Sequence, residues 1–194
     1  MSRITALLCI CVVLVSAGCD KIASSGISNT NFTLVNSNDL YQVALPDYMS
    51  EATNLSDEAA LQYQNLFKEL YVVVLDEPLL DFQETFQELG LYNDSLSVID
   101  NYTDAQYNTI IEGLDIKSEV IQKSVKINGL PARIVEFDAE VEDIDVPITY
   151  YYTFFEGKEN VYLMLAWTLQ TKRKKYQPIL EKISKSFRLI SDMK

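Results

Sequence analysis

The chain has 194 residues and a net charge of −12, and it contains no histidine. Its three cysteines, Cys9, Cys11 and Cys19, lie near the N-terminus, so the rest of the chain lacks the residues for Ser-His-Asp or Cys-His catalysis, for a disulfide, and for zinc or haem sites of the usual ligand types. From Cys19 to Thr171 it carries 7 basic and 26 acidic residues, which argues against a nucleic-acid partner because phosphate contacts need a basic surface.

Residues 1–18 have the pattern of an export signal. Arg3 precedes an apolar run from Ile4 to Val15, which is shorter than the roughly 20 residues that span a bilayer. The small residues 16–18 directly before Cys19 are similar to the bacterial lipobox, although Ser16 stands where the commonest lipobox has Leu. We therefore expect a signal peptide over residues 1–18, a lipid on Cys19, and attachment to a membrane of the bacterial cell envelope. Ordinary secretion and a transmembrane anchor are the alternatives.

Residues 19–31 are small and polar without hydrophobic periodicity, and they predict a flexible tether. A coil of this length has an end-to-end distance of about 20 Å, which keeps the following domain close to the membrane. Residues 32–194 have the size and the apolar content of a single globular domain.

The first half of this domain predicts strands and two helices. Short alternating runs at 32–35 and 40–45 indicate a hairpin. An alternating run at 61–65 and a β-branched run at 69–75, which is apolar on both faces, indicate two further strands. Pro78 opens a helix with an apolar stripe that Gly90 closes, formed by Leu79, Phe82, Phe86 and Leu89. A capping-box pattern at 103–106 predicts that a second helix begins at Thr103 and ends at Gly113. Both helices are expected to pack against the sheet.

The second half predicts an antiparallel meander and a last helix. Asn128-Gly129 is a hairpin turn between strands at 116–127 and 132–141, and further strands are expected at 148–155 and 161–169. A C-terminal helix has Pro178 in its first turn or at a kink and an apolar stripe of Tyr176, Ile179, Leu180, Ile183 and Phe187. Residues 188–190 suggest a final short strand.

Several of these segments resemble the superfamily of PsbP-like and DcrB-like proteins. The resemblance covers Phe32 to Ile190 and is carried by residues 41–48, 68–74, 127–132, 165–168 and 186–188. It implies an α+β fold, a twisted and mainly antiparallel sheet with helices on both faces in a three-layer sandwich. Members of this superfamily include extrinsic photosystem subunits, a regulator that binds a small GTPase, and envelope lipoproteins. The resemblance therefore implies a binding or assembly module, and it carries over no active-site residue.

Three groups of residues are candidates for a functional site. Glu136, Asp138, Glu140 and Glu142 alternate with apolar residues, so they share one face of a strand. We interpret them as a solvated face opposite Lys123 and Lys126, with a site for Ca²⁺ or a cationic partner as the alternative.

The second group is aromatic, and its members contribute mainly to the core. On a strand, Tyr150, Tyr152 and Phe154 share one face, and Tyr151 and Phe155 share the other. Tyr150, Tyr152 and Trp167 are its candidates for contact with a partner or ligand. The third group is basic and comprises Lys172, Arg173, Lys174 and Lys175. These four cations either extend into solvent and pair with the acidic body, or they contact anionic lipid headgroups near the membrane.

From the sequence we expect a non-catalytic envelope lipoprotein that binds or assembles with an envelope protein and uses no cofactor. A carrier or sensor of a small ligand or Ca²⁺ and a hydrolase with two carboxylates are the alternatives. A shallow surface with an exposed aromatic or charged patch favours the binding module. A closed apolar pocket favours the carrier, and two carboxylates about 5 to 9 Å apart in a cleft favour the hydrolase.

Overall fold

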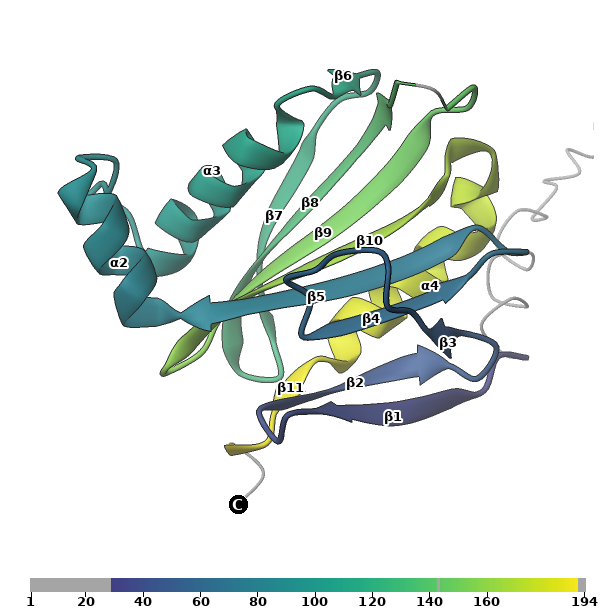
Figure 1. Cartoon of the computed structure of the whole chain (residues 1–194), viewed down its shortest axis with the longest axis horizontal. Coiled ribbons are helices and arrows are strands. Elements are labelled where there is room, and N and C mark those ends of the chain that lie inside the picture. The colour runs from purple at the N-terminus through teal and green to yellow at the C-terminus, as the bar shows by residue number, and fades with distance from the viewer. Residues whose placement is uncertain (1–28, 143, 192–194) are drawn as a thin grey trace, which may run out of the picture.

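The computed structural model describes residues 29–142 and 144–191. Figure 1 shows strands arranged in two sheets, with helices packed around them. In chain order, the elements of the described ranges are β1 (Phe32–Ser37), β2 (Tyr41–Pro46), β3 (Ser50–Glu51), β4 (Leu61–Asn65), β5 (Leu70–Pro78), α2 (Leu79–Glu88), α3 (Val98–Ile111), β6 (Asp115–Ile116), β7 (Ile121–Ile127), β8 (Leu130–Glu140), β9 (Ile148–Glu156), β10 (Asn160–Leu169), the 3₁₀ helix η1 (Gln170–Lys172), α4 (Arg173–Ser186) and β11 (Arg188–Leu189).

The larger sheet is antiparallel and has the strand order β3-β4-β5-β10-β9-β8-β6, and β7 pairs with β8 along the same edge as β6. Its long central strands are apolar on both faces, as the β-branched run of β5 and the aromatic run of β9 predict. A sheet of this kind needs a layer on each side, and the structure supplies both.

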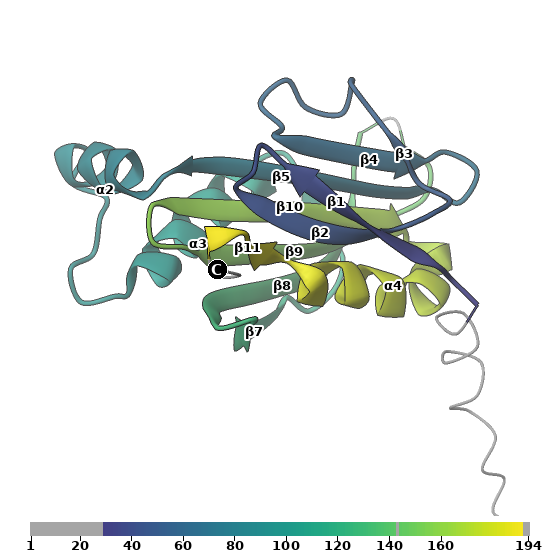
Figure 2. The ribbon, with the colours of Figure 1, turned by 90° about the horizontal axis from the view of Figure 1, so that it is seen from below.

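One face is covered by α4 and by the small sheet β1-β2-β11 (Figure 2). Here Tyr41 of β2 packs against Tyr162 of β10 and stacks on Phe187 at the end of α4, with ring centroids 5.5 and 5.0 Å apart. The opposite face is covered by α3 over β8 and β9, and by Phe82 of α2. The expected antiparallel sheet with helices on both faces is confirmed.

Most of the expected elements are present with small shifts of their ends. The hairpin of β1 and β2, the strands β4 and β5, the last short strand and the turn at Asn128-Gly129 are confirmed. Asn128 and Gly129 have φ angles of 49° and 89°, the positive values that this two-residue turn requires. The expected strand at 116–127 is divided into β6 and β7, because Lys117 and Ser118 bond to the backbone of Asp138 outside the regular ladder.

Two expectations about the helices were wrong, and one alternative was excluded. Helix α3 begins at Val98 rather than at Thr103, because Ser97 is its cap: the Ser97 hydroxyl accepts a hydrogen bond from the amide of Asp100. Of the two positions expected for Pro178, the first turn is excluded, because Pro178 is the sixth residue of α4. Leu89 is 63% exposed because it lies at the C-cap of α2, where the helix turns away from the sheet.

The expected signal peptide, Cys19 and residues 19–28 of the expected tether lie outside the described residues. Among the helices of the described ranges, none is long and apolar enough to cross a membrane.

Asn128 ties the β7–β8 turn to the end of α4, because its amide nitrogen donates to the carbonyls of Lys185 and Phe187 at 3.1 and 2.7 Å. Asn128→Gly keeps the positive φ accessible but removes both hydrogen bonds. We expect it to lower the free energy of unfolding, measured by urea denaturation, by about 1 to 2 kcal/mol.

Asn38→Gly is the matched control, because Asn38 has a φ of 51° in the exposed β1–β2 turn. Its effect should stay within about 0.5 kcal/mol. Equal losses for the two variants would show that the hydrogen bonds of Asn128 contribute nothing.

Candidate functional site

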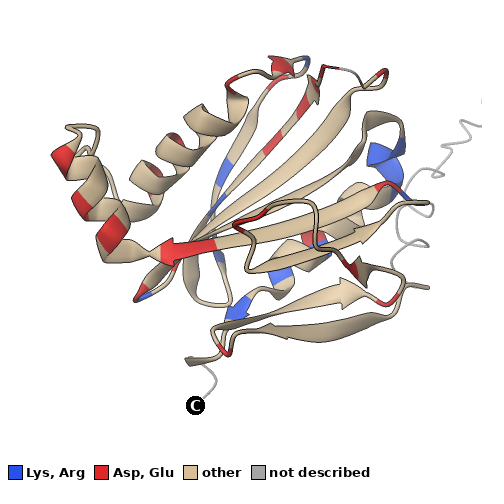
Figure 3. Cartoon of the chain, viewed as in Figure 1, with Lys and Arg blue, Asp and Glu red and all other residues tan. Residues whose placement is uncertain are grey.

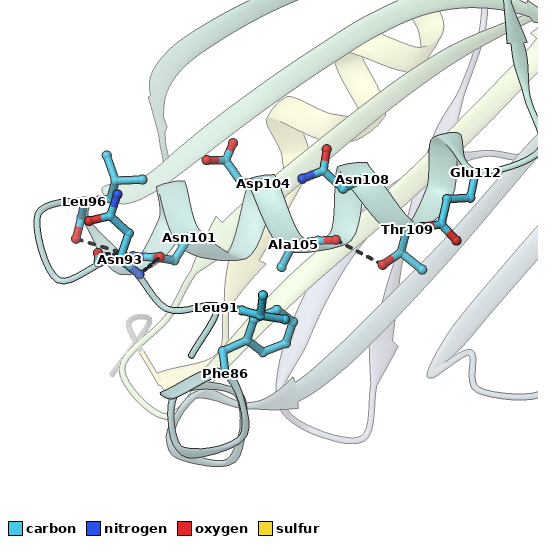
Figure 4. Close-up of a pocket in the computed structure, with 10 residues that line it drawn as sticks. All are labelled: Phe86, Leu91, Asn93, Leu96, Asn101, Asp104, Ala105, Asn108, Thr109 and Glu112. Carbon is cyan, nitrogen blue, oxygen red and sulfur yellow. Dashed lines mark hydrogen bonds between the residues drawn. The ribbon is translucent and has the colours of Figure 1, made fainter. Parts of the chain in front are cut away.

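A groove of about 490 Å³ lies between α2 and α3, beyond the end of β5 (Figure 4). Phe86 of α2 and Leu91 and Leu96 of the connecting segment provide its apolar surface. The exposed side chains of Asn93, Asp104, Asn108 and Glu112 lie along it, so the groove is open to solvent.

The end of α2 fixes the apolar side of the groove. Gly90 has a φ of 69°, and the amide of Leu91 bonds back to the carbonyl of Phe86 at 2.9 Å, which is the Schellman pattern of a helix C-terminus. In Figure 4 the Leu91 side chain overlaps the Phe86 ring, and both residues line the groove. Leu91 is nevertheless 65% exposed, so most of its surface remains available.

Buried polar contacts hold the connecting segment between α2 and α3. Asn101, on the first turn of α3, accepts a hydrogen bond from the Asn93 amide at 2.8 Å and donates to the Asn93 carbonyl at 3.0 Å. The Gln83 side chain of α2 donates to the Tyr92 hydroxyl at 3.0 Å. The shape of the groove is therefore set by hydrogen bonds within the α2–α3 unit.

Strands of the large sheet anchor α3. The Arg133 guanidinium of β8 pairs with Asp100, and the Glu156 carboxylate of β9 accepts from the Ile99 amide at 3.0 Å, where the helix dipole favours a negative charge. Partial burial opposes ionisation of Asp100, but hydrogen bonds from Ser97 and Arg133 outweigh it and hold its pKa below the usual range.

Farther along α3, the Gln106 side chain donates to Glu77 of β5 at 3.0 Å. Burial raises the pKa of Glu77 despite this bond and one from Tyr102. The three strands β5, β8 and β9 thus all contribute a charged side chain that positions α3.

The groove belongs to a part of the chain without positive charge. From Glu69 to Ile116 there are eleven acidic residues and no Lys or Arg. Figure 3 shows acidic residues following α2 along its length. Four leucines of the same region are exposed: Leu80, Leu89, Leu91 and Leu96. Leu91 and Leu96 line the groove, and exposed apolar surface beside charged residues is typical of an interaction site.

The alternating carboxylates of β8 lie elsewhere, and the expectation of a solvated face was wrong for two of them. Glu136 is 2% exposed and Asp138 is also buried, because the first turns of α4 cover them. Glu136 accepts hydrogen bonds from Lys123 at 3.1 Å and Gln177 at 2.8 Å. Asp138 accepts from Thr149 at 2.6 Å and Arg173 at 3.1 Å. Lys123 faces Glu136 as expected, whereas Lys126 lies opposite Pro131.

Glu140 pairs with Lys117 at 3.1 Å near the end of β8, and Glu142 is exposed beyond it. In the described ranges, no three Asp, Glu, His or Cys side chains come together as a metal site would require. Glu136 and Asp138 therefore belong to a covered network, whereas Glu140 and Glu142 are exposed.

The aromatic candidates take part in packing. Tyr150 and Tyr152 lie under α3 beside Phe137, with ring centroids 5.2 and 5.5 Å from it, and burial raises the pKa of both hydroxyls. Trp167 is partly buried and stacks on Tyr71 at 5.2 Å. The prediction that Tyr150, Tyr152 and Phe154 share one face, while Tyr151 and Phe155 share the other, is confirmed.

The basic cluster, like the carboxylates, is divided between a buried network and solvent. Arg173 points at the sheet, where it pairs with Asp138 and approaches Glu136 at 3.8 Å. Lys174 and Lys175 are exposed, and the Lys175 ammonium lies 5.0 Å from the centre of the Tyr176 ring. Lys172 lies at the end of η1. Pairing with the acidic body is confirmed for Arg173 alone.

None of the candidate site residues that the sequence indicated lines the groove between α2 and α3. A signal for it is nevertheless present in the sequence: the run from Glu69 to Ile116 combines unmixed negative charge with leucines outside the helical stripes. Neither property alone identifies a groove, because its walls form only when α2 folds back beside α3.

Two solved structures share the architecture of this chain. CyanoP, the cyanobacterial PsbP of Synechocystis sp. PCC 6803, is 13% identical and has a TM-score of 0.51 over 91% of this chain and 98% of its own. LpqN of Mycobacterium tuberculosis, which is involved in cell envelope biogenesis, is 13% identical and has a TM-score of 0.52 over 87% of this chain and 96% of its own. No family model and no curated protein matches the sequence. The chain thus has the PsbP-like fold that the resemblance implied.

The network under α4 predicts a difference between neighbouring cations. Arg173→Ala leaves the buried carboxylates of Glu136 and Asp138 without their shared partner. We expect it to lower the free energy of unfolding by about 3 kcal/mol. Lys174→Ala removes an equal charge from an exposed position and should change it by at most about 0.5 kcal/mol. Urea denaturation measures both, and a loss for Arg173→Ala no larger than that for Lys174→Ala would contradict the role of this network.

Proposed function

We propose that this chain is a lipid-anchored envelope protein that binds another envelope protein without catalysing a reaction. We assign the binding site to the groove between α2 and α3. The observation that carries the proposal is the combination of exposed leucines with an acidic surface that contains no Lys or Arg between Glu69 and Ile116.

This combination specifies the chemistry of the partner. The groove takes an apolar side chain over Phe86 and Leu91, and the carboxylates of Asp104 and Glu112 on its wall attract Lys or Arg. The exposed carboxylates of Glu84 and Glu88 extend the negative potential along α2. A segment with alternating apolar and basic residues, such as a basic amphipathic helix, fits both features.

The covered carboxylates support a non-catalytic role. Glu136 and Asp138 lie under α4, and their oxygens already accept hydrogen bonds from four side chains. A substrate has no access to this pair while α4 is in place, which counts against a carboxylate hydrolase. The open and charged groove fits a small apolar cargo less well than it fits a polypeptide segment.

Membrane attachment rests on the lipobox-like sequence ending at Cys19. The fold is compatible with an envelope role, since LpqN, with the same architecture, is involved in cell envelope biogenesis. Attachment restricts the domain to the membrane surface, where a partner in the same membrane is encountered at a high effective concentration.

Site-specific photo-crosslinking in native membranes tests the proposal. A benzophenone amino acid replaces Leu91 in the groove or, as the control, Leu34, which is 51% exposed on β1. We expect one envelope protein to be captured from position 91 only, through a segment that carries Lys or Arg beside apolar residues. Cys19→Ser should weaken the capture, because it removes the expected lipid.

Charge reversal separates specific binding from chance contact. Glu84→Lys with Glu88→Lys should lower the yield of the crosslink by about tenfold, because opposite charges at an interface become like charges. Glu51→Lys with Glu119→Lys makes the same change in net charge at exposed positions outside the groove and should leave the yield unchanged. Equal capture from positions 91 and 34, or equal loss in both charge variants, would rule out the groove as the binding site.

A further inference from the structure

The turn between β4 and β5 exposes the most accessible large apolar side chain of the described residues. Phe67 is 96% exposed and its neighbour Leu66 is 61% exposed. Lys68 follows directly, and its ammonium lies 4.7 Å from the centre of the Tyr48 ring. An aromatic side chain that is almost fully exposed at the tip of a turn contributes nothing to the core, so its position requires another explanation.

The described chain begins at the same end of the molecule. Asn31 accepts a backbone hydrogen bond from Asp47 at 3.0 Å, and Thr30 bonds to the side chain of Tyr48. Asn65, at the start of the β4–β5 turn, donates to the carbonyl of Tyr48. The turn therefore lies beside the point where residues 1–28 join the domain. The segment from Cys19 to the first described residue is about ten residues long, and a coil of that length spans roughly 18 Å.

The remaining lysines of the basic cluster lie at this end as well. Leu70 at the start of β5 pairs with Thr168 near the end of β10, which places the β4–β5 turn next to η1 and the start of α4. Lys68, Lys172, Lys174 and Lys175 thus accompany the exposed Leu66 and Phe67. Figures 1 and 3 show the start of β1 and the first basic turn of α4 at the end of the molecule opposite α2.

Three carboxylates lie near the β4–β5 turn, those of Asp47, Glu51 and Glu69, and the four lysines outnumber them by one. The Asp47 carboxylate accepts from Thr33 at 2.6 Å, and the Glu69 carboxylate accepts from Tyr71 at 2.8 Å. The acidic connection between β8 and β9 lies at the same end but on the β9 side of β10, where its Pro147 carbonyl accepts a hydrogen bond from the Gln170 amide of η1 at 2.8 Å. When the domain tilts toward the β4–β5 turn, Phe67 reaches a flat membrane surface before the β8–β9 connection does.

We propose that this end of the domain docks on the lipid bilayer, with Phe67 and Leu66 inserted at the headgroup level and the four lysines against anionic headgroups. This inference rests on the membrane anchoring of the proposed function and adds an orientation to it. Exposed aromatic side chains and neighbouring basic residues are two typical features of protein segments that bind at a membrane surface. Docking at this end directs the groove between α2 and α3 away from the membrane.

Depth-dependent quenching of tryptophan fluorescence tests the orientation. The chain has one tryptophan, so Trp167→Phe provides a background in which Phe67→Trp or Leu91→Trp is the only emitter. The full chain is purified from bacterial membranes in detergent and reconstituted into vesicles of phosphatidylcholine and phosphatidylglycerol with brominated acyl chains. Flotation of the vesicles reports anchoring independently of quenching.

We expect both variants to float, and only the tryptophan at position 67 to lose about half of its fluorescence, since tryptophan favours the headgroup level. Quenching should weaken in vesicles of phosphatidylcholine alone, because the lysines then meet no anionic lipid. Flotation with no quenching at position 67, or with equal quenching at both positions, overturns the docking surface but leaves the anchoring intact. Failure to float overturns the anchoring and the inference with it.

A second measurement does not depend on replacing Trp167. Phe67→Cys and Leu91→Cys each introduce one thiol beyond Cys19 in the mature chain, and a water-soluble maleimide on the vesicles modifies exposed thiols. We expect the thiol at position 67 to react about tenfold more slowly than that at position 91. Equal rates contradict docking through the β4–β5 turn.

Discussion

The arrangement of this protein depends on central strands that are apolar on both faces. β5, β9 and β10 expose no polar face that water could solvate, so each side of the sheet must be covered. Helix α4 and the small sheet cover one side, and α3 covers the other. Where α4 extends past the apolar part of β8, the side chains of Glu136 and Asp138 meet Arg173 and Gln177, so the same helix that closes the core also closes a charged network.

The long strands also separate the two ends of the molecule. β5 runs from Leu70, beside the β4–β5 turn, to Pro78, where α2 begins. Nine residues of strand extend about 30 Å. The start of the described chain lies at one end of this strand together with Lys68, Lys172, Lys174 and Lys175, and the acidic groove lies at the other. A rigid sheet of this length can hold a partner-binding surface at a fixed distance from a membrane.

The sequence predicts the architecture well, because hydrophobic periodicity depends on local patterns that the folded chain preserves. The hairpin at Asn128-Gly129 and the alternating faces of Tyr150, Tyr151 and Tyr152 are examples. It fails where two local patterns compete for the start of one helix. The pattern at Thr103 resembles a helix start, but Ser97 caps α3, and Thr103 lies inside the helix with its hydroxyl bonded to the carbonyl of Ile99.

The positions of the candidate sites, in contrast, depend on tertiary contacts. Alternation correctly places Glu136 and Asp138 on one strand face, yet no local pattern shows that α4 crosses that face. The exposure of Phe67 is equally hidden, since an apolar residue beside strands is normally expected in the core. The groove between α2 and α3 is formed by segments whose approach depends on Asn101, Arg133 and Glu156.

The central claim is that the sheet holds the groove away from the membrane to which we propose that the chain is attached. Energy transfer from a dye on Leu91→Cys to acceptors in the headgroup layer, in the full reconstituted chain, measures this separation directly. The length of β5 predicts that the dye lies about 30 Å or more from the headgroups. A dye within about 10 Å, a few residues of extended strand, would place the groove at the membrane surface and contradict the account.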